Sequence, residues 1–211
     1  MRTAVLILTF CLCVHAQTAP QAASKGLPAR ATPGDYQTQA KAGGVTIAAE
    51  FTAHSLPTVD GPLNTDDYIG VEVALFGPEG TPLKISAADF SLRVNGKKTL
   101  DSQPFVLLMP SLRDPEWIPP EAPEKKSKSS MSGGGGGQGG ESSGPPPPVK
   151  VPVAEQRAWT QRLQKAALAE GDRPLPQAGL LFFAYHGKTK GIESVELTYH
   201  GPAGTTTLKL Q

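Results

Sequence analysis

Hydrophobic and polar side chains alternate along several stretches of this chain, and a period of two is typical of a β-strand with one buried face. The pattern is clearest in four stretches, residues 45–51, 69–75, 90–94 and 195–199, and shorter versions occur at 83–85 and 208–210. A continuous apolar run at 180–185 predicts a strand that is covered on both faces.

Turn-forming residues separate these predicted strands. Asn95 and Gly96 follow the strand at 90–94, and an Asn-Gly pair readily adopts the positive φ angles of a type I′ turn, so we expect a hairpin there. Residues 54–67 contain two prolines and a glycine and are predicted to form a loop. One more apolar run occupies residues 105–109.

A single helix is predicted, at residues 153–170. Ala158, Trp159 and Leu163 fall near one helical face, good helix formers surround them, and Gly171 suits the position after a helix. Seven to nine short strands with one helix and no alternation of strands and helices indicate an all-β fold. The expected architecture is an antiparallel β-sandwich.

A long insertion interrupts the predicted strands. Residues 110–152 hold ten of the 21 prolines and eight of the 23 glycines, including the runs 133–137 and 145–148. Such a composition offers little apolar surface to offset the entropy of ordering, so we expect a disordered low-complexity loop. The strands on either side lack enough apolar surface alone, which predicts a single domain over residues 43–211, interrupted by this loop.

The start of the chain resembles an export signal. Residues 1–16 combine Arg2, an apolar run and small residues before Gln17, which is the layout of a cleaved signal peptide. A lipoprotein signal needs a small residue before its cysteine, and Phe10 before Cys11 argues against lipidation. Residues 17–42 lack hydrophobic periodicity and are predicted to be a disordered leader.

Charge and cysteine content refine the expected location. Both cysteines, Cys11 and Cys13, lie in the predicted signal, so the mature chain would rely on its core without disulfides, which favours a bacterial envelope protein. Without Arg2, the Lys and Arg residues equal the 19 Asp and Glu residues, which gives no electrostatic footprint for nucleic acid. We therefore expect a secreted or periplasmic protein with no transmembrane helix.

The order of the segments is similar to a known family. Tyr68-Ile69-Gly70-Val71-Glu72-Val73-Ala74-Leu75, then Leu83-Lys84-Ile85-Ser86 and Asp89-Phe90-Ser91-Leu92-Arg93-Val94-Asn95-Gly96-Lys97, resemble bacterial telokin-like, immunoglobulin-like extracellular domains, as do residues 179–183 and 192–197. The resemblance covers residues 44–109 and 174–211. It implies an immunoglobulin-like sandwich outside the cytoplasm, with no shared catalytic residues. The insertion and the helix depart from the usual pattern of this family.

Candidate chemical groups are few. The mature histidines His54, His186 and His200 lack the spacing of a zinc site and are interpreted as surface or turn residues. Four oxygen-bearing side chains in one loop, Asp60, Asn64, Asp66 and Asp67, could suit calcium, but they lack the EF-hand order and more simply cap turns. The glycine run 133–137 has no P-loop context. We predict no catalytic, cofactor-binding or metal-binding residues and no cofactor.

Trp117 lies among prolines and has two interpretations. It packs back onto the core, which we favour because a large aromatic side chain rarely stays exposed, or it belongs to a partner-binding motif. The expected function is a non-enzymatic module that binds an unidentified protein or envelope component. The alternative is a secreted carbohydrate-binding or hydrolase-accessory sandwich domain.

Overall fold

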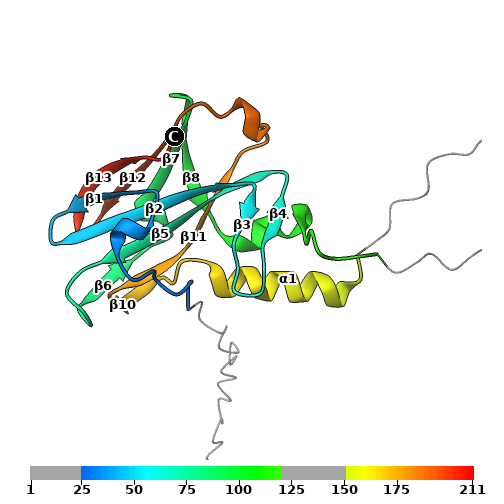
Figure 1. Cartoon of the computed structure of the whole chain (residues 1–211), viewed down its shortest axis with the longest axis horizontal. Coiled ribbons are helices and arrows are strands. Elements are labelled where there is room, and N and C mark those ends of the chain that lie inside the picture. Colours follow the sequence, from blue (N-terminus) through cyan, green and yellow to red (C-terminus); the bar gives the residue numbers. More distant parts are fainter. Residues whose placement is uncertain (1–24, 120–150) are drawn as a thin grey trace, which may run out of the picture.

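The computed structural model describes residues 25–119 and 151–211, and these form a predominantly antiparallel β-fold with one α-helix (Figure 1). The predicted signal peptide and residues 120–150 of the insertion lie outside the described residues. The strands are β1 Thr38–Ala42, β2 Val45–Ala53, β3 Ser55–Leu56, β4 Leu63–Thr65, β5 Tyr68–Phe76, β6 Pro82–Ile85, β7 Phe90–Val94, β8 Thr99–Gln103, β9 Leu112–Arg113, β10 Gly171–Pro174, β11 Gln177–Ala184, β12 Val195–Gly201 and β13 Gly204–Lys209. The helix is α1 Val153–Ala166, and the 3₁₀ segments are η1 Pro33–Asp35, η2 Ala87–Asp89, η3 Phe105–Ser111 and η4 Thr189–Gly191.

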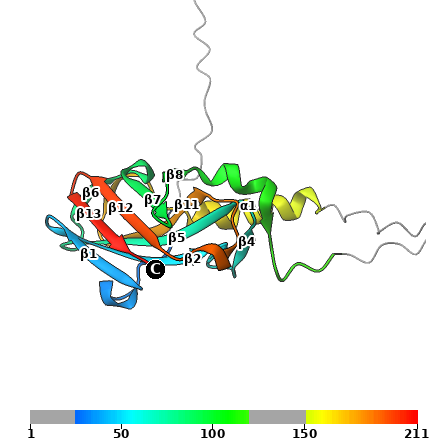
Figure 2. The ribbon, with the colours of Figure 1, turned by 90° about the horizontal axis from the view of Figure 1, so that it is seen from above.

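Eight strands form one sheet in the order β1-β2-β5-β11-β8-β7-β12-β13. The sheet curls, so that its outermost strands approach each other: the Gln37 side chain, just before β1, donates to the Leu210 carbonyl, just after β13. The largest core lies inside the curl and joins inward side chains of both halves, such as Ile47, Val71, Phe90 and Leu197. In Figures 1 and 2, α1 and β4 lie at one end of the molecule, and β1, β12 and β13 lie toward the other.

The continuous apolar run 180–185 forms most of β11, and the prediction of a strand covered on both faces is confirmed. β11 follows the insertion in sequence, yet it lies between β5 and β8, which both precede it. Its odd-numbered residues Leu181 and Phe183 face the largest core, whereas Leu180 and Phe182 face a second core on the other side of the sheet. Burial on both faces explains why the run is apolar throughout.

β11 pairs with β8 at only two positions, and the chain after α1 fills the remaining seam. Leu168 donates its backbone N–H to the Leu180 carbonyl at 3.0 Å. This close approach needs a glycine beside it, because a Cβ on Gly179 would lie 2.4 Å from Leu168 Cα. The helix therefore ends at Ala166, four residues earlier than predicted, where Ala167 turns to bridge to Leu180.

The predicted Asn-Gly hairpin is confirmed. Asn95 and Gly96 have φ angles of 52° and 63°, as a type I′ turn requires, and they connect β7 to β8. The Asn95 side chain also donates to the Gly191 carbonyl at 2.6 Å and accepts from the backbone of Glu193 at 2.7 Å and of Ser194 at 3.1 Å. One turn residue thus holds two loops together.

Short strands and η3 surround the helix where the sequence predicted simpler structure. The predicted loop 54–67 contributes β3 and β4, and β9 extends them into a three-stranded sheet. The apolar run 105–109 forms η3, a 3₁₀ segment. Residues 110–119, assigned to the low-complexity loop, form the end of η3, β9 and a segment against α1. Their apolar side chains join a second core, which includes Leu56, Leu108 and Leu163.

The predicted leader 17–42 is wrong for its described part, because residues 25–42 belong to the fold. β1 pairs with β2 in full register, from Thr38 opposite Ala49 to Ala42 opposite Val45. Residues 25–36 cross the outer face of β11, β5 and β2, where a third, smaller core includes Tyr36. Leu27 and Tyr36 are the only large apolar residues of this segment and lie nine residues apart, so the sequence showed no periodicity there.

Candidate interaction surface

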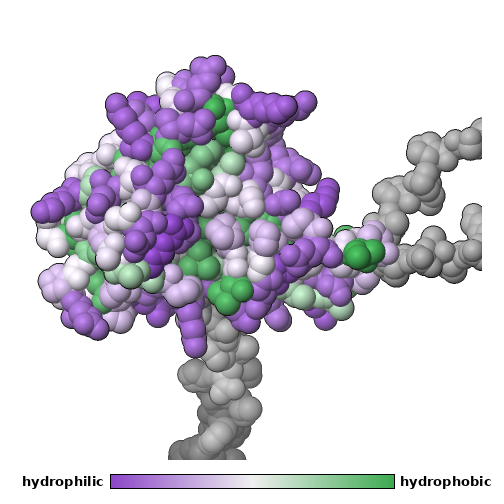
Figure 3. Space-filling view, viewed as in Figure 1, coloured by the Kyte–Doolittle hydropathy of each residue, from purple (hydrophilic) through white to green (hydrophobic). Residues whose placement is uncertain are grey.

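The exposed hydrophobic side chains of the described residues gather at one end of the molecule. Within residues 25–119 and 151–211, six large apolar residues are exposed, and they lie in α1 or in segments beside it: Val59, Val106, Leu107, Met109, Ile118 and Val153. Figure 3 shows a mostly hydrophilic face with hydrophobic residues at this end, beside the grey trace. Single exposed apolar residues are ordinary, whereas several in neighbouring segments indicate a surface that contacts something other than water.

Three of the six belong to η3, and the geometry of a 3₁₀ helix explains their exposure. Residues three apart eclipse each other in this helix, so its side chains form three rows. One row, Phe105, Leu108 and Ser111, points inward, and Leu108 is fully buried. The other two rows are entirely apolar, with Val106 52%, Leu107 47% and Met109 39% exposed and Pro110 exposed beside them. We call these four residues the η3 face.

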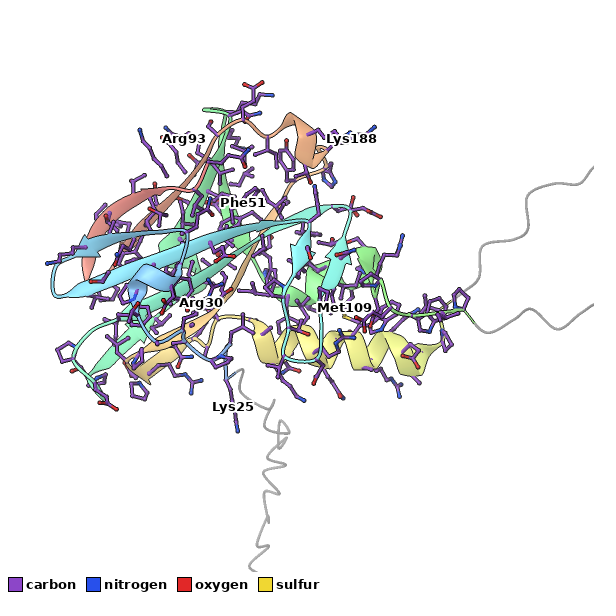
Figure 4. The ribbon with its side chains drawn as sticks, viewed as in Figure 1. Lys25, Arg30, Phe51, Arg93, Met109 and Lys188 are labelled. Carbon is purple, nitrogen blue, oxygen red and sulfur yellow. The ribbon has the colours of Figure 1, made fainter. Side chains whose placement is uncertain are left out.

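Buried contacts hold η3 in place from below. The Ser111 hydroxyl lies 2.7 Å from the Thr65 hydroxyl in β4, and it donates to the Leu108 carbonyl at 3.1 Å. Both hydroxyls are buried, and a buried hydrogen bond is expensive to break. The η3 face is therefore fixed to the short sheet, and Figure 4 shows Met109 above α1.

Trp117 packs onto the core, as the favoured interpretation predicted. Its ring meets that of Trp159 in α1 edge to face, with the two centroids 6.0 Å apart. Trp159 is buried and Trp117 is half-buried. The contact attaches the segment after β9 to the helix, and it leaves part of the Trp117 side chain at the surface close to Ile118.

An ion pair ties the same segments together. Arg162 in α1 hydrogen-bonds to the Asp114 carboxylate, and its second terminal nitrogen donates to the Gly61 carbonyl at 3.0 Å. Both charged side chains are largely buried, with 16% and 11% exposed. Arg162 thus connects the helix, the β3–β4 loop and the segment that carries Trp117, so the whole end is rigidly linked to the core.

The three histidines have different contacts: His54 and His186 lie beside the same loop after β11, and His200 lies in β12. His54 is half-buried between two backbone carbonyls, with Nδ1 2.7 Å from that of Tyr68 and Nε2 2.9 Å from that of Gly187. His186 contacts the Asp67 carboxylate at 3.1 Å. His200 contacts the Thr205 hydroxyl at 2.7 Å.

The loop oxygens considered for calcium do not converge. Asn64 lies in β4 opposite Ser55, Asp66 lies 3.7 Å from Arg113, and Asp67 contacts His186. No group of three potential metal ligands is found among residues 25–119 and 151–211. The remaining member of the set, Asp60, is exposed.

Asp89, the last residue of η2, is the carboxyl group of the described residues whose pKa departs most clearly from its ordinary value. Burial raises the pKa of Asp89, and Glu170 adds to the effect. A backbone hydrogen bond from Ser86 and the nearby His200 oppose it. The neighbouring Tyr199 hydroxyl also has a raised pKa, because its side chain is buried in the largest core.

The η3 face was not predicted from the sequence. Its signal was the apolar run 105–109 between Pro104 and Pro110, which is too short to reveal its periodicity. Among residues 105–119, Trp117 was the one side chain that the sequence analysis singled out. The histidines and loop carboxylates, by contrast, were visible in the sequence and form no common site.

Comparison with known proteins adds little. The chain matches no protein-family model and no curated protein sequence. Within the described residues, no helix is long and apolar enough to cross a membrane. Among solved structures, the chain is similar to that of a putative lipoprotein (ycdA) from Bacillus subtilis, with 14% sequence identity, a TM-score of 0.36, and coverage of 82% of this chain and 38% of that chain. A likeness this loose carries no argument about fold or function.

Proposed function

We propose that this chain is a non-enzymatic, secreted or periplasmic interaction module, built on an immunoglobulin-like β-sandwich, that binds a protein or envelope component. The sandwich is supported by the curled antiparallel sheet, whose two halves share one core. The export pattern of residues 1–16 supports the location.

The η3 face carries the proposal. Its four outward residues are all apolar, and the Ser111–Thr65 hydrogen bond anchors them from within. An ordered apolar surface can bind without first paying the entropy of its own folding. Large exposed apolar side chains in one region are typical of a protein-contact surface.

A capture experiment tests this function. The mature protein, immobilised, is incubated with the envelope fraction of its own organism, and bound proteins are identified by mass spectrometry. We expect one partner in stoichiometric amount. The double variant Leu107→Gln/Met109→Gln should capture at least tenfold less, while its unfolding free energy stays within about 0.5 kcal/mol of the wild type, because both side chains are exposed.

A matched control places the same substitution at the other end of the molecule. Thr205→Gln/Thr207→Gln alters two exposed positions of β13 and should leave capture unchanged. Equal capture by both double variants would contradict a role for η3. Binding on a glycan array that survives the η3 substitutions, or hydrolysis of a reporter glycoside, would favour the carbohydrate-active alternative instead.

A further inference from the structure

Residues 25–31, at the start of the described part of the chain, lie on the sheet like a bound peptide. We call residues 25–31 the arm; in Figure 4, Lys25 and Arg30 mark its two ends. The arm belongs to no strand ladder. Its backbone contacts include an isolated bridge from Leu27 to Ala178, a hydrogen bond from the Arg30 N–H to the Tyr36 hydroxyl at 3.1 Å, and one from the Gln177 side chain to the Lys25 carbonyl at 3.0 Å.

The sheet beneath the arm is shaped to receive it. Three alanines occupy directly paired positions on adjacent strands, Ala48 in β2, Ala74 in β5 and Ala178 in β11. All three are fully buried, and Ala29 of the arm packs against them. Larger side chains at these positions would fill the space that the arm now occupies.

Beside the alanines lies a site for one cation. Glu50 and Glu72 are directly opposite each other on β2 and β5, an arrangement that is unfavourable for two like charges. Arg30 resolves it, with one terminal nitrogen 2.5 Å from the Glu50 carboxylate and the other 2.9 Å from that of Glu72. The Glu72 side chain is 9% exposed, so this carboxylate has little contact with water.

Further contacts match the flat shape of a guanidinium group. The Arg30 guanidinium carbon lies 4.4 Å from the centre of the Tyr36 ring, and its first terminal nitrogen also donates to the Asp35 carbonyl at 2.6 Å. Burial lowers the pKa of Arg30, but hydrogen bonds to Glu50 and Glu72 outweigh it, so the pKa is raised overall. A planar fork can reach both carboxylates and the ring together, whereas an ammonium group cannot.

We propose that this site is a recognition site for the arginine of an extended peptide segment from a partner protein, and that the arm is its displaceable internal ligand. The partner segment has the chemistry of the arm: an apolar residue at the Leu27 position, a small residue over the alanines, and arginine between Glu50 and Glu72. The site shares no residue with the η3 face, so it can succeed or fail independently of the function proposed above.

Peptide binding tests the site in the full-length protein. The probe is a synthetic capped peptide with the sequence of residues 25–31, and binding is measured by calorimetry. In the wild type the tethered arm competes at an effective concentration on the order of millimolar, which weakens apparent binding. Arg30→Ala removes the competing guanidinium, so this variant should bind the peptide at least tenfold more tightly than the wild type.

Two controls isolate the carboxylate pair. The triple variant Arg30→Ala/Glu50→Gln/Glu72→Gln keeps the side-chain shapes and should lose the gain in affinity. A peptide with citrulline in place of arginine keeps the shape without the charge and should bind at least tenfold more weakly than the arginine peptide. Equal binding by the two Arg30→Ala proteins, or of the two peptides, would overturn the proposal.

A measurement on the wild type covers the case in which Arg30→Ala fails to fold. A displaceable arm opens without global unfolding, so the backbone amides of Leu27, Ala29, Arg30 and Ala31 should exchange with solvent at least 100-fold faster than those in the centre of β5. If the arm amides exchange as slowly as the amides of β5, the arm is a fixed part of the core, and this result would also overturn the proposal.

Discussion

Substituting Gly179 by alanine tests how the helix is attached to the sheet. The new methyl group would lie 2.4 Å from Leu168 Cα and 2.6 Å from its backbone nitrogen. Ordinary contact between carbon atoms is about 3.5–4.0 Å, so the overlap exceeds about 1 Å. Both opposing atoms are backbone, and no side-chain rotation can relieve the clash.

The chain at Ala167 and Leu168 must therefore move off β11. The move breaks the 3.0 Å hydrogen bond from Leu168 to Leu180, worth about 1 kcal/mol, and partly exposes two buried apolar side chains, worth about 1–2 kcal/mol more. Alanine also lowers the conformational entropy of the unfolded chain relative to glycine, which by itself stabilises the folded protein by about 0.4–1 kcal/mol. We expect Gly179→Ala to lower the unfolding free energy by about 2–3 kcal/mol.

Urea unfolding measures this value, followed by tryptophan fluorescence for the α1 end and by far-UV circular dichroism for the sheet. Gly44→Ala is the matched control, because no atom lies within 4 Å of its new methyl group and its φ is not in the left-handed region. The control should be neutral or slightly stabilising. If Gly179→Ala lies within about 0.5 kcal/mol of Gly44→Ala, the segment after α1 does not lie against β11 as described.

Substitutions at three further positions can be measured on the same protein. Leu163→Ala opens a cavity in the second core and should cost about 2–5 kcal/mol in urea unfolding; a loss below about 1 kcal/mol would contradict its full burial. Asn95→Ala loses three hydrogen bonds and puts alanine, which tolerates positive φ less well than asparagine, at φ 52°, so it should cost about 2–3 kcal/mol, and Asn95→Gly about 1 kcal/mol less. If Asn95→Ala and Asn95→Gly are equally stable, backbone strain at residue 95 does not contribute to the loss of stability. For Asp89 the folded pKa is raised, so its contribution to stability is full below the unfolded pKa of about 3.8 and is lost as pH rises through the folded value. Asp89→Asn should therefore raise the melting temperature at pH 7, with a difference from wild type that disappears toward about pH 3, and a difference independent of pH would contradict this.

The sequence predicted best those elements whose signals are local. The Asn95-Gly96 turn needs only its own φ angles. The alternation at 69–75 separates the large apolar side chains that face the largest core from the smaller or polar ones on the face that the arm covers. The run 180–185 was apolar throughout because β11 separates two cores. In each case the pattern of neighbouring residues in the sequence is enough to predict the element.

The parts that were missed depend on distant partners. The arm is held by Glu50, Glu72 and Ala178, and nothing in its own seven residues shows that such a surface exists. The two rows of the η3 face are apolar like its buried row, so hydrophobicity alone could not tell inside from outside. Predicting either feature would require knowing first which strands are neighbours.

The position of β11 also constrains the order in which the protein can form. During synthesis β5 and β8 are complete about 75 residues before β11 has emerged, so until then the edges that β11 will occupy have no native partner. Contacts between segments this far apart in sequence form slowly, because the long loop must close first. A chain that stops at residue 119 would hold five of the eight strands of the sheet and would leave open edges on β5, β8 and β7, which can pair with any exposed strand nearby. The sheet can therefore form completely only after the last third of the chain has been synthesised, because that part contributes its central strand β11.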